Sequence, residues 1–169
     1  MMKPFFVINF VFFQVSWLLA AFYSDYAALL IIVLLVVHFL LSPTRRLDSH
    51  ILLMGLLGIV VDQCLISANV FSVGQSIIPW WLMMLWLLLS LCLNHSLGWL
   101  RNLRAWQVAL IGSVFGTLSY VAALNLGVLT TTLTTLEFVI VVMMIWFLLL
   151  PIMVKFAKVI QFKEEAMNE

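Results

Sequence analysis

Residues 51–70 read ILLMGLLGIVVDQCLISANV, an almost wholly apolar run with one carboxylate, Asp62, near its middle. A helix needs roughly 20 apolar residues to cross the hydrocarbon core of a bilayer. An acidic side chain near the bilayer centre costs at least roughly 2.5–3.5 kcal/mol on insertion scales. Gly55, Gly58 and Asp62 follow an i, i+3, i+7 spacing, so we expect this face of the helix to look into a bundle, away from lipid.

The composition of the whole chain supports a membrane protein. Of its 169 residues, 66% are hydrophobic and only 9% are charged, against about 25% charged in soluble domains. The apolar runs leave only short connections, so neither a separate soluble domain nor nucleic-acid binding is expected. Cys64 and Cys92 occur in different runs, without the spacing of a zinc site or redox pair, and we interpret both as packing residues.

The sequence predicts an all-α, polytopic integral membrane protein with six transmembrane helices in one bundle. The predicted transmembrane domain covers residues 1–154, and a polar cytoplasmic tail covers residues 155–169. The predicted helices cover residues 5–22, 27–41, 51–70, 80–97, 106–126 and 133–154.

The distribution of basic residues predicts the orientation. With six spans, all eight lysines and arginines fall on one side of the membrane. Short basic loops stay in the cytoplasm, so both termini are expected to be cytoplasmic.

Several polar side chains are expected near the level of Asp62, taking about 1.5 Å of depth per helical residue. This predicted polar binding layer consists of Gln14, Asp62, Tyr120, Asn125 and Glu137. Thr130, Thr134 and Glu137 are spaced i, i+4 and i+7, which predicts a second inward-facing stripe. Two nearby acids without a cation would share or bind a proton. Alternatively, Asp62 is hydrogen-bonded to Gln14 or Tyr120 and only fixes the register of its helix.

A second polar group is expected at the cytoplasmic ends of the helices and consists of His38, His50, Asn94 and His95. No H-x-x-x-H or H-E-x-x-H spacing occurs, and Asp48 is the one acid near them in the sequence. We therefore predict no metal site and no cofactor, and expect these histidines to meet lipid headgroups. The neighbouring arginines are predicted to contact anionic lipid. They are Arg45, Arg46, Arg101 and Arg104.

The chain resembles a bacterial inner-membrane family of unknown function, domain-of-unknown-function family 2878. The residues that carry the resemblance are Asn9, Trp17, the Gly58-to-Asp62 step, Pro79-Trp80, Leu85-Trp86, Gly116, Ser119-Tyr120 and Leu126-Gly127. The prolines associated with the Gly116 motif are replaced here by Phe115 and Thr117. The resemblance implies a multi-pass protein of the bacterial inner (plasma) membrane, encoded beside acyl-chain-modifying proteins.

Three functions stay open at this point, and with them the question of whether the protein is an enzyme. The first is an accessory or scaffold protein in membrane-lipid acyl-chain modification or envelope homeostasis. The second is a small proton-coupled carrier or channel that uses the Asp62 and Glu137 layer, and the third is an intramembrane lipid-modifying enzyme. The expected partner is the phospholipid bilayer. A membrane enzyme and a further copy of the chain are candidate partners in addition to it.

Overall fold

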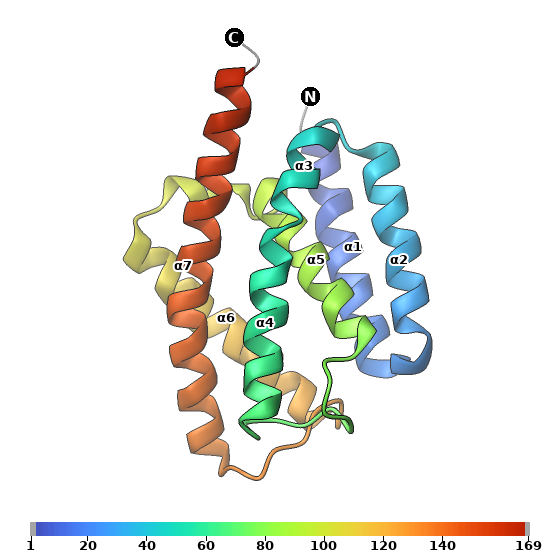
Figure 1. Cartoon of the computed structure of the whole chain (residues 1–169), viewed down its shortest axis with the longest axis vertical. Coiled ribbons are helices and arrows are strands. Elements are labelled where there is room, and N and C mark those ends of the chain that lie inside the picture. The colour runs from blue at the N-terminus through green and yellow to red at the C-terminus, as the bar shows by residue number, and fades with distance from the viewer. Residues whose placement is uncertain (1–2, 168–169) are drawn as a thin grey trace.

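Long apolar runs become helices in a membrane because only a helix satisfies all backbone amides and carbonyls within one segment. The computed structural model describes residues 3–167 and consists of such helices (Figure 1). They are α1 (Lys3–Phe22), α2 (Ser24–Leu41), α3 (Arg45–Ile51), α4 (Met54–Ser67), α5 (Trp80–Asn94), the 3-10 helix η1 (Gly98–Asn102), α6 (Ala105–Asn125) and α7 (Thr135–Met167). Within the described residues there is no β-strand, and one isolated bridge pairs Ser72 with Thr130.

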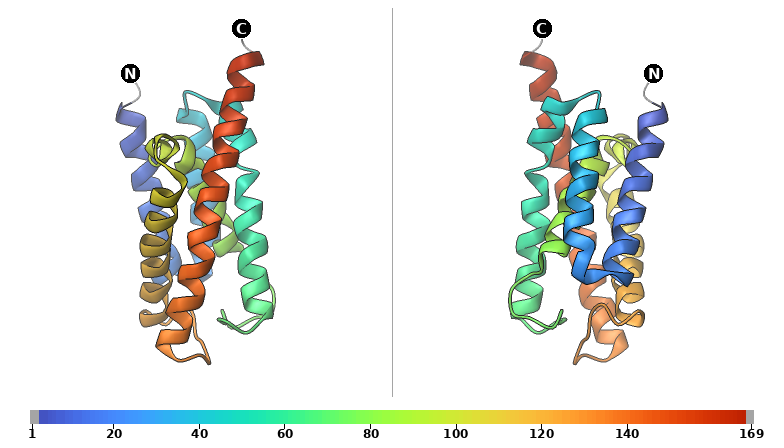
Figure 2. Two further views of the ribbon diagram at one scale, coloured as in Figure 1. Left: turned by 90° about the vertical axis from the view of Figure 1, so that its left-hand side faces the viewer. Right: turned by 90° about the vertical axis from the view of Figure 1, so that its right-hand side faces the viewer.

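The chain is an all-α membrane protein. Among the described residues, five helical segments are long and apolar enough to cross a bilayer, and the 15-residue α5 is a shorter apolar helix. The start of α1 and the end of α7 lie at the same end of the bundle (Figure 1). The connections over residues 68–79 and 126–134 lie at the opposite end (Figure 2). Six crossings and cytoplasmic termini remain predictions.

Several helix boundaries differ from the expected ones. The segment expected to be a polar loop forms α3, which ends at Ile51. Within the run over 51–70, only Met54–Ser67 forms the helix α4. Helix α5 ends at Asn94 rather than at residue 97. Helix α7 continues through the expected polar tail to Met167 and projects beyond the other helices (Figure 1). Residues 1, 2, 168 and 169 of the predicted domain and tail lie outside the described residues.

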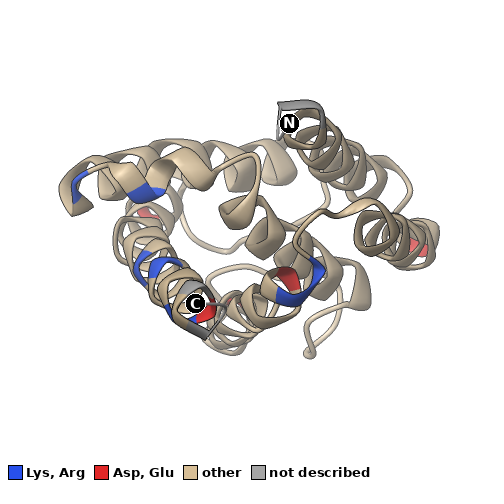
Figure 3. Ribbon diagram, turned by 90° about the horizontal axis from the view of Figure 1, so that it is seen from above, with Lys and Arg blue, Asp and Glu red and all other residues tan. Residues whose placement is uncertain are grey.

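The extension of α7 is held by contacts with α3. Ala157 is completely buried, and the carboxylate of Glu164 lies 3.0 Å from Nε of Arg46. The sequence of this segment also favours a helix, because Lys, Glu and Gln are good helix formers. Apart from Lys3 at the start of α1, the arginines and lysines of the described chain lie on α3, around η1 and on the last turns of α7. Figure 3 views the bundle from the end that holds the termini.

Glycines let two tryptophans enter the centre of the bundle. A Cβ atom on Gly58 of α4 would lie 2.0 Å from the Trp86 ring of α5, and one on Gly116 of α6 would lie 2.1 Å from the Trp146 ring of α7. The two indoles stack on each other, with centroids 5.4 Å apart and planes 17° apart. Neither glycine can be replaced without displacing an indole.

At the end of the bundle opposite the termini, hydrogen bonds join the two uncharged connections. Ser72 and Thr130 exchange two backbone hydrogen bonds, of 2.8 and 2.9 Å. The side chain of Gln63 accepts from the amide of Ile78 at 2.8 Å and donates to the carbonyl of Ser76 at 3.0 Å. These bonds hold the connection between α4 and α5 against α4.

We expect Gly58→Ala to destabilise the protein by about 1–3 kcal/mol, because the added methyl group overpacks the site of the Trp86 ring. Thermal unfolding in detergent, followed by tryptophan fluorescence, measures the effect. Leu56→Ala is the matched control, since Leu56 lies on the same helix with its side chain 52% exposed. Equal unfolding temperatures for the two variants would contradict this account of the packing.

Candidate functional site

The first polar site surrounds Asp62 on α4, whose side chain is completely buried. Nε1 of Trp86 donates to Oδ2 at 2.6 Å, and the hydroxyl of Tyr120 donates to Oδ1 at 2.5 Å. The inward orientation of Asp62 is therefore confirmed, as is its hydrogen bond with Tyr120. The two bonds join α4 to α5 and α6, and each carboxylate oxygen has a donor, as a buried carboxylate requires.

The other members of the predicted layer do not surround Asp62. Gln14 is exposed on α1, and Asn125 is exposed as the last residue of α6. Neither makes a hydrogen bond to Asp62. The alternative in which Gln14 pairs with Asp62 is therefore wrong, and a role for Gln14 or Asn125 in binding stays a prediction.

The prediction that Glu137 faces inward is wrong. Glu137 is exposed, and its carboxylate accepts from the amide and hydroxyl of Thr134 at 2.9 and 2.8 Å. The Thr134 hydroxyl in turn accepts from the amide of Glu137 at 3.3 Å. This reciprocal pair is a capping box at the start of α7. Thr130 lies before that helix, so the i, i+4, i+7 spacing does not describe a helical face.

A cavity of about 700 Å³ lies beside the Asp62 site, among α1, α5, α6 and α7. Its wall is mainly aromatic and aliphatic, and its aromatic lining includes Phe10, Phe13, Trp17, Trp86, Phe115 and Trp146. The hydroxyl-bearing Tyr120, Ser119 and Ser96 are among its few polar groups. Nε1 of Trp17 donates to Oγ of Ser119 at 2.9 Å and so links α1 to α6 across the cavity.

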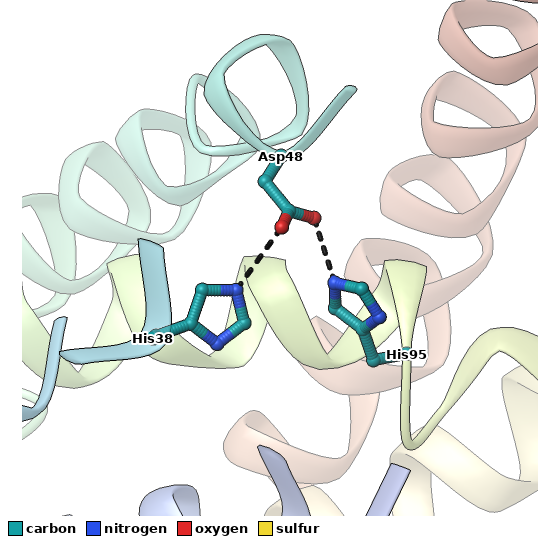
Figure 4. Close-up of side chains that lie close together, drawn as sticks. All are labelled: His38, Asp48 and His95. Atoms are coloured by element: carbon teal, nitrogen blue, oxygen red, sulfur yellow. Dashed lines mark hydrogen bonds and ion pairs between the residues drawn. The ribbon is translucent and has the colours of Figure 1, made fainter. Parts of the chain in front are cut away.

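The second polar site lies at the end of the bundle that holds the termini, where α2, α3 and α5 meet. Figure 4 shows its three central side chains, with both imidazoles directed at the carboxylate of Asp48. Nε2 of His38 lies 3.2 Å from Oδ2, and Nε2 of His95, the residue after α5, lies 2.8 Å from Oδ1. His38 and Asp48 are completely buried, and His95 is 9% exposed.

Two further donors complete the surroundings of Asp48. The hydroxyl of Ser42 donates to Oδ2, and the amide of Asn94 donates to Oδ1 at 2.7 Å. The Arg101 guanidinium donates to the side-chain oxygen of Asn94 at 3.3 Å and to its backbone oxygen at 3.2 Å. The carboxylate therefore receives four hydrogen bonds, and the Asn94 amide is itself held in place.

The prediction that the histidines meet lipid headgroups is wrong for His38 and His95, which are buried. His50 does not belong to the cluster around Asp48. Its Nδ1 lies 3.4 Å from the carboxylate of Glu164 on α7. No local spacing could reveal the site, because its members come from three elements 10 and 47 residues apart in sequence. The sequence feature that could indicate this site is the presence of Asp48, Asn94 and two histidines at one end of the predicted bundle.

The four arginines predicted to contact anionic lipid all lie near this end of the bundle. Arg45 donates to the carbonyl of Leu40 at 2.6 Å, and Arg46 pairs with Glu164 while its side chain remains 65% exposed. Arg101 is half-buried, and Arg104 is exposed. Arg45, Arg46 and Arg104 are thus exposed to the medium around the bundle, and their contact with lipid stays a prediction.

The comparisons with known proteins identify a family. The model of a family described as "Protein of unknown function (DUF2878)" matches residues 6–152, most of the chain. The chain belongs to the DUF2878 family. The DUF2878 match covers Asp62, Asp48 and both buried histidines. No match to the chain is found among curated proteins, and none among solved structures.

We expect Asp62→Asn to be tolerated better than Asp48→Asn. An asparagine at 62 can accept from Trp86 and donate to Tyr120, because a phenol hydroxyl can reverse its role. An asparagine at 48 replaces one acceptor oxygen by a donor. If that donor faces His38, the ring must move its proton to Nδ1, a buried atom without a hydrogen-bond partner. The cost of such an unpaired group is about 1–3 kcal/mol.

Thermal unfolding of both variants in detergent tests this order of stabilities. Asp25→Asn serves as the control, because Asp25 is exposed in the first turn of α2. A larger loss of stability in Asp62→Asn than in Asp48→Asn would show that the hydrogen bonds around the two carboxylates are not the ones described.

Proposed function

We propose that this protein binds the acyl chain of a membrane phospholipid in its intramembrane cavity and acts as an accessory protein in membrane-lipid acyl-chain modification. The observation that carries the proposal is the cavity of about 700 Å³ among α1, α5, α6 and α7. Its size falls within the range of about 300–1,000 Å³ of ligand sites, and its lining is mainly apolar and aromatic, as in such sites.

The cavity reaches the outer surface of the bundle. Phe10, Phe115 and Leu118 belong to its lining, yet their side chains are 47%, 67% and 58% exposed. In a bilayer the medium at that surface is acyl chains. A hydrocarbon chain gains no hydrophobic energy on moving from lipid into an apolar cavity, so close packing against the wall has to provide the affinity. Aromatic rings provide a large, rigid surface for that packing.

One end of the cavity favours an anionic headgroup. Ser96, Trp99 and Leu100 line the cavity next to Arg101 and Arg104, at the basic end of the bundle. Basic residues at the membrane surface attract anionic lipids. A phospholipid would therefore place its headgroup at this end and its chain along the cavity, towards Tyr120 and Trp81.

The carrier alternative receives no such support. It requires a water-filled route to Asp62, but that carboxylate is completely buried and both of its oxygens accept hydrogen bonds from Trp86 and Tyr120. The second acid of the carrier, Glu137, caps α7 instead.

The test is photo-crosslinking in vesicles of phosphatidylethanolamine and phosphatidylglycerol that contain a phosphatidylglycerol with a diazirine on one acyl chain. Every membrane protein is labelled on its outer surface, so the informative labels are those on lining residues that are buried. We expect labels on Trp86 and Trp146, which are 3% and 8% exposed. Labels confined to outward-facing residues would contradict the proposal.

A matched pair of variants separates binding in the cavity from contact at the surface. Ala123→Phe adds a ring to the lining of the cavity on α6, and Val114→Phe adds the same ring to an exposed position of that helix. We expect Ala123→Phe to reduce labelling of Trp86 and Trp146 at least several-fold and Val114→Phe to leave it unchanged. Equal labelling in both variants would also contradict the proposal.

A further inference from the structure

We propose that His38, Asp48 and His95 form a binding site for a divalent first-row transition metal ion such as Zn²⁺ or Fe²⁺. This inference is independent of lipid binding, because it rests on a different cluster of residues. One ligand atom from each residue lies within 4.8 Å of the others, and all three residues are buried. Two imidazole nitrogens and one carboxylate are a ligand set of catalytic zinc sites and of non-haem iron sites.

The distances between the ligand atoms fit a small ion. Ligands at the usual distance of about 2.0 Å from a tetrahedral zinc ion lie about 3.3 Å from one another. The carboxylate oxygens of Asp48 already lie 3.2 Å from Nε2 of His38 and 2.8 Å from Nε2 of His95. The full set of three ligand atoms lies within 4.8 Å, so binding also requires side-chain rotations that bring the two imidazoles closer together.

The charge of the cluster also favours a cation. Asp48 is completely buried, and its hydrogen-bond partners among the described residues are two imidazoles, a hydroxyl and an amide. The nearby guanidinium of Arg101 bonds to Asn94. A buried carboxylate is costly unless an opposite charge or several hydrogen bonds compensate it. Four hydrogen bonds already compensate Asp48, and a metal ion bound by both Nε2 atoms would replace the two from the imidazoles by an opposite charge.

The surroundings of the cluster hold its carboxylate as metal sites require. Ser42 and Asn94 donate to the two oxygens of Asp48, and Arg101 holds Asn94 in turn. Phe5 closes the site with an apolar wall, since its ring centroid lies 5.2 Å from His38 and 4.7 Å from His95. Such second-layer contacts orient metal ligands and control solvent access.

One feature of the cluster predicts the strength of binding. A ring that binds a metal through Nε2 carries its proton on Nδ1, and Nδ1 of His38 is buried without a partner. Loss of such an outer hydrogen bond typically lowers metal affinity by about 10–100-fold. Three protein ligands also leave coordination positions for water or a substrate. The ion is therefore expected to exchange with chelators, in contrast to a closed structural site.

Cobalt titration of the full chain tests the inference. The protein is purified in detergent with an affinity tag that contains no histidine, treated with EDTA and freed of the chelator. Co²⁺ is then added while its visible absorption is recorded. We expect saturation at one equivalent per chain, reversal by EDTA and displacement by Zn²⁺. X-ray absorption of the zinc form should show nitrogen ligands with the scattering of imidazole.

Three variants locate the ion. Asp48→Asn and His95→Gln should each lower Co²⁺ affinity by more than about 10-fold, as loss of a direct ligand exceeds the effect of an outer contact. His50→Ala is the matched control, since it removes a histidine at the same end of the bundle that pairs with Glu164. It should bind Co²⁺ like the unmodified protein.

Two results would overturn the proposal. One is the absence of saturable Co²⁺ absorption in the folded, unmodified protein up to millimolar metal, which would leave a proton-sharing hydrogen-bond network as the role of the cluster. The other is saturable binding that is lost in His50→Ala but retained in His95→Gln. The first result does not depend on any variant, so a failure of Asp48→Asn to fold leaves the test intact. Loss of metal binding with lipid labelling unchanged would leave the proposed lipid function standing.

Discussion

The need to satisfy two buried carboxylates organises this bundle. Asp48 and Asp62 are both completely buried, so protein groups rather than solvent have to compensate their carboxylates. Helix α5 supplies donors to both, through Trp86 to Asp62 and through Asn94 and the following His95 to Asp48. This short helix therefore lies at the centre of the fold, in contact with α1, α2, α3, α4 and α7.

Small residues make this arrangement sterically feasible. The indole of Trp86 reaches Asp62 because Gly58 on α4 leaves room for its ring, and Trp146 stacks on that ring because Gly116 on α6 leaves room in the same way. Close approach of small residues is the usual basis of helix packing in membranes. In this protein it also determines a polar contact, since displacement of the Trp86 ring would remove a donor from Asp62.

The sequence predicts those features of the structure that follow from local periodicity. The apolar runs identify the helices, and the face shared by Gly55, Gly58 and Asp62 is buried as expected. The Thr134 to Glu137 spacing fits a helical stripe and a capping box equally well, and the structure has the capping box. The sequence places Asp48 in a polar loop near the histidines, and its burial between them depends on the helix α3 that this segment forms.

Neither the cavity nor the histidine cluster can be predicted from local sequence, because each is built from several helices that meet at α5. Both depend on α5 and the turn that follows it. On one face, Leu85, Leu89, Cys92 and Ser96 line the cavity at spacings of three and four residues. Asn94 and His95 turn to Asp48 instead.

The end of α5 is fastened to α1 by Asn9, whose side-chain oxygen accepts from the amide of Ser96 at 3.1 Å and from its hydroxyl at 2.5 Å. Ser96 follows His95 directly and also lines the cavity. A displacement of His95 by an ion would therefore act on a residue of the cavity wall and, through Asn9, on α1. The turn at the end of α5 is therefore a direct physical link between the two proposed sites.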